Sequence, residues 1–156
     1  MERKQKQPYP VIVDWAINAL KTPVFQKSFT ANIDEPELIL DTTGVGVAIN
    51  DMFRAKNVYP IAASITAGNG LTTVPGIYHL GKARLIGMFL AALDSGRVQI
   101  NPNLPIYLQL EREMINYRAE ITEQGNAKFN AVEGEHDDLL FSLALAVWWG
   151  EEARRA

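Results

Sequence analysis

The sequence predicts an α/β fold, with a mixed sheet and flanking helices, from three patterns. Residues 37–65 hold an apolar strand pattern, a glycine-containing turn, a helical pattern and a second strand pattern, which is typical of a right-handed βαβ crossover. Apolar residues recur at helical spacing over 11–20, 79–93, 104–114 and 139–149. Alternating residues on both sides of Gly125 and Asn126 predict a late β-hairpin over 117–132.

Shorter segments complete this prediction. The apolar run 38–40, closed by Asp41, suits a strand buried on both faces. Residues 66–76 contain three glycines and a proline, which predicts a long loop of the kind that often carries function. Residues 98–100 predict a short strand, and the helix over 104–114 is expected to present its acidic residues on the outer face.

Composition narrows the class of protein. The chain has 156 residues, of which 47% are hydrophobic and 21% charged, and we expect a single domain with a core over 9–150 and disorder over 1–8. The absence of cysteine excludes disulfides, thiolate catalysis and cysteine-based zinc sites, and two histidines are too few for a histidine-rich metal site. With a net charge of −3, binding to nucleic acid requires a local basic patch.

Targeting signals are also missing from the sequence. No stretch reaches the roughly 18 apolar residues that a membrane span needs. The charged start of the chain is not followed by the apolar segment of a signal peptide. We therefore expect a cytoplasmic protein without a membrane partner.

Asp41 is the first candidate site residue. It follows a predicted buried strand, at the end of the sheet where open α/β folds place their ligands. A carboxylate at such a place needs a cation or hydrogen-bond donors. Two roles fit this position, either a metal ligand or a cap of the following helix.

The second candidate is the acidic segment 133–138, which precedes an apolar helix and contains four acids and His136. Acids are favoured at a helix N-terminus, so one interpretation is a solvated helix start. Their number exceeds what capping requires, and carboxylates suit Mg²⁺ or Mn²⁺. Combined with Asp41, this segment suggests two-metal phosphodiester hydrolysis, which requires Asp41 and Asp138 to meet in space.

Two further features carry weaker signals. Residues 43–46 contain two glycines but lack the ending of a phosphate-binding P-loop, so we expect a tight turn with close helix packing, and a P-loop-like or actin-like nucleotide site is the less favoured alternative. Lys82 and Arg84 are candidates for contact with DNA phosphates, and solvated surface residues are the other interpretation.

These motifs together resemble the C-terminal nuclease domain of phage and prophage terminase large subunits. The resemblance runs from about Pro10 to Trp149, and it lies in the order of four motifs: residues 38–46, residues 65–69, the helix with Lys82, and residues 136–139. It implies a ribonuclease H-like fold and cleavage of double-stranded DNA during genome packaging in a bacterial host.

The resemblance also implies roles for individual residues. Asp41 matches the second acid of a cluster that holds two Mg²⁺ or Mn²⁺ ions, and the third acid maps to Asp138, with Asp137 as the alternative. His136 matches a histidine beside the site that transfers protons or orients phosphate. DNA-contacting roles fall to Lys82 and Arg84.

The sequence departs from the family at its start. The first catalytic aspartate of the family lies on strands upstream of the first helix, and neither this acid nor the ATPase domain has a counterpart here. We therefore expect a truncated ribonuclease H-like fold whose strand at 38–40 has an open edge, covered by a second copy, a completing chain or residues 24–30. An inactive prophage remnant that binds DNA or serves in assembly is the alternative function.

Overall fold

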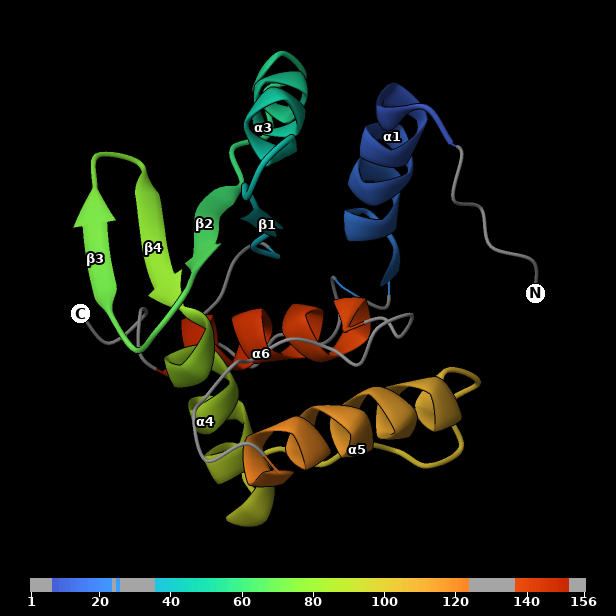
Figure 1. Cartoon of the computed structure of the whole chain (residues 1–156). Helices are drawn as coiled ribbons and strands as arrows, with labels where there is room; N and C mark the ends of the chain where they lie inside the picture. The colour runs from blue at the N-terminus through green and yellow to red at the C-terminus, as the bar shows by residue number, and fades with distance from the viewer. Residues whose placement is uncertain (1–6, 24, 26–35, 124–136, 152–156) are drawn as a thin grey trace. The chain divides into compact units, whose positions relative to one another are not determined.

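The computed structural model describes residues 7–23, 25, 36–123 and 137–151, with the backbone alone over 118–123 (Figure 1). These residues form an α/β structure, as predicted. Its elements in chain order are α1 (Tyr9–Leu20), β1 (Ile39–Asp41), α3 (Gly46–Arg54), β2 (Ile61–Thr66), β3 (Leu71–Val74), β4 (Ile77–Gly81), α4 (Lys82–Asp94), α5 (Tyr107–Glu123) and α6 (Asp138–Glu151).

The four strands form one mixed sheet in the order β1-β2-β4-β3. β1 and β2 are parallel, with Ile39 opposite Ile61 and Asp41 opposite Ala63, which confirms the predicted pair of parallel strands joined by a helix. β1 is the edge strand of the described sheet, and its residues are half-buried or exposed. The expectation of a strand buried on both faces is therefore wrong, because none of the three residues of β1 is buried.

The described residues divide into two compact units. The first consists of Met1–Ile65 and Thr73–His79, and the second of Thr66–Thr72 and Leu80–Ala156. In the first unit α3 packs against α1 and β1, and the buried side chains include Val13 and Phe53. An ion pair of 2.7 Å between Lys56 Nζ and Asp14 Oδ1 joins α1 to the residues after α3. The helices predicted over 11–20 and after Gly46 are confirmed.

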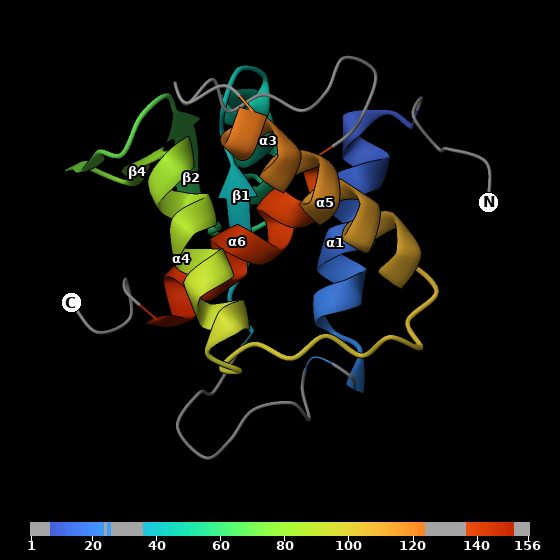
Figure 2. The same cartoon turned by 60° about the horizontal axis from the view of Figure 1, so that its bottom comes forward.

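In the second unit α6 packs against both α4 and α5 (Figure 2). Its sequence is apolar almost throughout, and its buried residues are Leu140, Phe141, Ala144, Leu145 and Trp148. The ring of Phe141 meets Tyr117 of α5 edge to face, with 5.9 Å between ring centroids. A helix that is apolar on most of its surface needs neighbours on more than one side, and α4 and α5 meet this need.

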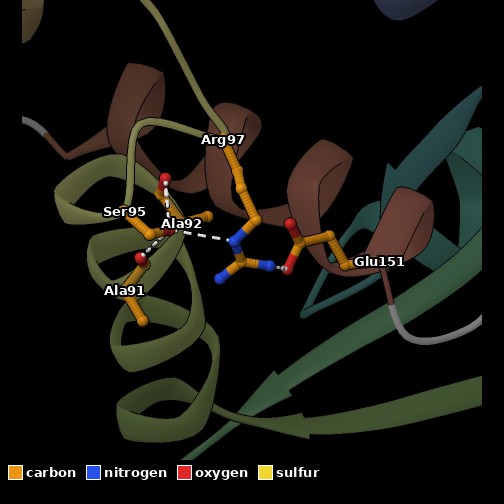
Figure 3. A network of polar contacts seen from close by, with 5 residues as sticks. All are labelled: Ala91, Ala92, Ser95, Arg97 and Glu151. Atoms are coloured by element: carbon orange, nitrogen blue, oxygen red, sulfur yellow. Dashed lines mark hydrogen bonds and ion pairs between the residues drawn. The ribbon is translucent and has the colours of Figure 1, made fainter.

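A polar network joins the C-terminal ends of α4 and α6 (Figure 3). Arg97 donates from Nε to Ser95 Oγ at 2.9 Å and forms an ion pair through its guanidinium with Glu151. The Ser95 hydroxyl is in turn hydrogen-bonded to the carbonyl oxygens of Ala91 and Ala92 in the last turn of α4. The network thus closes α4 and ties its end to α6.

The predicted loop over 66–76 is wrong. β2 continues to Thr66, and β3 and β4 form a hairpin whose turn contains Gly76 with φ of +83°. Helix α4 begins at Lys82, so His79 and Leu80 belong to β4 and not to the following helix.

Two further expectations are corrected downstream. Residues 98–100 are not a strand, and the Val98 N–H donates to the Ala92 carbonyl as the chain leaves α4. α5 begins at Tyr107 and continues to Glu123, so the first arm of the predicted hairpin over 117–132 is helical. The second arm lies outside the described residues.

Other expectations concern residues at the limits of the described ranges. Residues 1–6 lie outside it, whereas Pro8 is the N-cap of α1 and accepts hydrogen bonds from the N–H groups of Val11 and Ile12. Of the segment 24–30, expected to cover the edge at β1, only Phe25 is described, and it is helical. No helix in the described part of the chain is both long and apolar enough to span a membrane.

Gly81 joins β4 to α4 at a point of close backbone contact. Its N–H donates to the Gly70 carbonyl at 2.7 Å, and the Ala83 N–H donates to the Gly68 carbonyl at 3.0 Å. These carbonyls serve α4 in place of a side-chain cap, which is absent at its N-cap. A Cβ atom on Gly81 would lie 2.4 Å from the Gly68 oxygen, so only glycine fits.

Replacing Gly81 with alanine is therefore expected to destabilise the protein by about 1–3 kcal/mol, since the backbone at Gly68 must move. Gly87→Ala is the matched control, because Gly87 is exposed within α4 and its added Cβ meets nothing within 4 Å. That substitution should stabilise by roughly 0.5–1 kcal/mol. Urea denaturation measures both changes, and equal effects of the two variants would contradict this account of Gly81.

Candidate functional site

Asp41 ends β1 with an exposed side chain whose orientation is fixed by hydrogen bonds. Its Oδ1 atom accepts from the Thr43 N–H at 2.9 Å and from the Thr43 hydroxyl at 2.6 Å. The Thr43 hydroxyl accepts in turn from the Ile65 N–H of β2 at 3.0 Å. Among the described residues no donor meets Oδ2, so this oxygen can serve an external cation or donor.

The turn after Asp41 is as tight as its glycines predict. Gly44 has φ of +64°, and a Cβ atom on Gly46 would lie 2.3 Å from the Asp41 carbonyl oxygen. Glycine is therefore needed at both positions, at one for its conformation and at the other for close packing. The N-cap of α3 is Val45, without a side-chain hydrogen bond, so the interpretation of Asp41 as a helix cap is wrong.

Asp137 and Asp138 precede and begin α6, where the helix dipole favours negative charge. Their side chains have different surroundings. Oδ2 of Asp137 lies 3.3 Å from Nζ of Lys82 in a partly buried ion pair, whereas Asp138 is exposed. Asp137 is thus neutralised from within the protein.

Lys82 is held on several sides. In addition to Asp137, its Nζ lies 4.8 Å from the ring centroid of Phe141 and 5.7 Å from that of Tyr117. Cations are attracted to ring faces at such distances. The side chains of Lys82 and Asp137 are only 22% and 27% exposed. Lys82 is therefore not an ordinary solvated cation, and Arg84 is also partly buried.

Glu113 of α5 is an important residue that sequence reasoning missed. It is 4% exposed, and its Oε2 accepts from the N–H groups of Leu139 and Leu140 at 2.9 and 3.0 Å. Oε1 accepts from Nε2 of Gln109 at 3.3 Å. Glu113 thus caps the first turn of α6 from another helix, so the expectation of acids only on the outer face of α5 is wrong. No local signal distinguishes it from Glu111.

The structure describes five of the six predicted site residues. Asp41 belongs to the first unit, whereas Lys82, Arg84, Asp137 and Asp138 belong to the second. His136 lies outside the described residues, together with 133–135. Within the described ranges no three His, Cys, Asp or Glu side chains gather in a group able to hold a metal ion.

Comparison with protein-family models, with curated proteins and with solved structures finds no match to this chain.

Removal of the Glu113 cap should lower the free energy of unfolding. Glu113→Ala leaves the buried N–H of Leu140 and the partly buried N–H of Leu139 without this acceptor, at an expected cost of about 1–3 kcal/mol. Glu111→Ala is the control, since among the described residues Glu111 accepts a single long hydrogen bond, of 3.4 Å, from Tyr107 on its own helix. Chemical denaturation of both variants checks the prediction, which fails if their losses are alike.

The Lys82–Asp137 pair should show measurable coupling in a double-mutant cycle with Lys82→Met and Asp137→Asn. We expect about 1 kcal/mol, the upper end for ion pairs that retain some solvent contact. The more exposed pair of Lys56 and Asp14 provides the comparison, with Lys56→Met and Asp14→Asn expected to couple by less than about 0.5 kcal/mol. Coupling no larger than in the comparison pair would show that partial burial and the two rings add nothing.

Proposed function

We propose that this chain is a metal-dependent DNA endonuclease domain of the phage terminase type, with a ribonuclease H-like fold. In this proposal Asp41 and Asp138 supply carboxylate ligands to Mg²⁺ or Mn²⁺, and double-stranded DNA is the substrate. Lys82 and Arg84 contribute positive charge near the DNA.

One observation carries the proposal: Asp41 ends a parallel strand with one carboxylate oxygen held and the other open. The carboxyl ends of parallel strands are the usual ligand-binding end of such sheets. Both hydrogen bonds from Thr43 go to Oδ1, and the side chain of Asp41 is exposed. Oδ2 can therefore accept a ligand without loss of the hydrogen bonds that close the turn.

The surroundings of the two adjacent aspartates favour Asp138 over Asp137 as the second ligand. Asp137 has its charge balanced by Lys82, whereas Asp138 is exposed in the first turn of α6. In the proposal Asp137 holds Lys82 in place and Asp138 faces the cation. His136 retains the role that the resemblance gives it, at the reacting phosphate.

The described carboxylates fit a hard divalent cation in type, since Mg²⁺ and Mn²⁺ prefer oxygen ligands. The chemistry supplied by such ions when bound is activation of the attacking water and stabilisation of the leaving oxygen. A further acid is needed to complete the family's set of ligands. The edge of β1 is the place where another strand, from a second copy or another chain, would bring one.

A second function has its own support. The neutralisation of Asp137 by Lys82, and the lack of a three-ligand group among the described residues, favour a module that binds DNA or serves in assembly without cleavage. Such a module would need no metal.

Nicking of supercoiled plasmid in Mn²⁺ tests the nuclease proposal. We expect Asp41→Asn and Asp138→Asn to reduce nicking to the level seen with a chelator, because each removes a charged ligand oxygen. Asp51→Asn is the control, since Asp51 is an exposed acid on α3 outside the proposed site, and it should retain activity. Nicking that survives both site substitutions would overturn the proposal. Absence of both nicking and calorimetric Mn²⁺ binding in the wild-type chain would favour the DNA-binding module.

A further inference from the structure

We infer that Thr43 is a positioning residue, which orients the Asp41 carboxylate so that Oδ2 faces the cation. This inference rests on the proposed function, because it assumes that Asp41 is a metal ligand. It concerns a residue that contacts the ligand carboxylate and not the metal or the DNA.

The first step of the argument is the number of hydrogen bonds at Oδ1. Two donors from one residue, the Thr43 N–H and hydroxyl, meet this single oxygen at 2.9 and 2.6 Å. Together they fix the rotation of the carboxylate about the Cβ–Cγ bond of Asp41. Oδ2 is left as the oxygen available to a cation, so the geometry favours ligation through one oxygen.

The second step is the link from Thr43 to the sheet. The Thr43 hydroxyl has one proton, which it donates to Asp41, and its lone pairs accept the Ile65 N–H of β2 at 3.0 Å. The carboxylate is thereby tied to a strand and not only to the turn in which it lies. Serine can replace threonine in this arrangement, whereas valine and alanine cannot.

Thr42 provides an internal comparison. Its hydroxyl donates to the Ala63 carbonyl at 3.1 Å and makes no contact with the carboxylate of Asp41. Thr42 and Thr43 therefore both bind the turn to β2, but only Thr43 touches the proposed ligand. Substitution of Thr42 separates the stability of the turn from the orientation of Asp41.

The experiment is a Mn²⁺ titration by isothermal calorimetry, with thermal unfolding measured in parallel, on the wild-type chain and on Thr43→Val, Thr43→Ser, Thr42→Val and Asp41→Asn. Groups that orient a metal ligand typically change metal affinity by about 10-fold to 100-fold when removed, and we expect Thr43→Val to weaken Mn²⁺ binding by this factor. Thr43→Ser should stay within about threefold of wild type. Thr42→Val should lower the unfolding temperature but leave the affinity for Mn²⁺ unchanged.

The outcomes separate the inference from the proposed function. If Asp41→Asn abolishes Mn²⁺ binding and Thr43→Val binds as wild type does, the inference is overturned and the proposed function stands. If the wild-type chain binds no Mn²⁺, or Asp41→Asn binds it normally, both are overturned. A measurement on the wild-type chain does not depend on the folding of a variant. In its NMR spectrum, Mn²⁺ should broaden the amide signals of Thr43 and Ile65. Unchanged signals at saturating Mn²⁺ would also overturn the inference.

Discussion

The parallel pairing of β1 with β2 is the constraint on which the surroundings of Asp41 depend. β1 has only three residues, so its strand ladder is short. The two following threonines extend the pairing beyond the strand, since Thr42 donates twice to the Ala63 carbonyl and Thr43 accepts from Ile65. The two threonine hydroxyls thus extend the hydrogen bonding between β1 and β2 beyond the backbone ladder. These hydrogen bonds of Thr42 and Thr43 hold the chain against β2 directly before the sharp turn at Gly44 and the start of α3.

In the second unit, the first turn of α6 also depends on a side chain from another segment. A helix buried among others must satisfy its first N–H groups, and water is not available to all of them. Glu113 accepts from two of these groups, and α6 thereby depends on α5 for its first turn. Lys82 and Asp137 join the starts of α4 and α6, whereas Arg97 and Glu151 join their ends.

The sequence predicted those elements whose pattern is strong within one segment. The strand ending at Asp41, the helix after Gly46 and the apolar helix α6 are examples. β3 was not predicted. All of its residues are exposed, so its sequence lacks the alternation of apolar and polar residues that marks a half-buried strand, and the neighbouring glycines favour a loop. The spacing of Tyr117 and Ile121 fits a helix as well as a strand. The turn pattern at Gly125 favoured the strand, whereas the structure has a helix there. Glu113 and the partner of Lys82 depend on contacts between distant segments, which no local pattern contains.

The difference between the two aspartates at α6 shows how neighbouring acids acquire separate roles. A carboxylate that leaves water needs a compensating charge, and Lys82, whose Nζ also lies near the rings of Tyr117 and Phe141, supplies it to Asp137. That ion pair lowers the net charge at the helix start, so Asp138 meets less repulsion than two free acids would produce. Asp138, in contrast, begins α6 with an exposed side chain, whereas Asp137 is only partly exposed. Two adjacent residues of one type thus differ in burial, and Lys82 accounts for the more buried position of Asp137.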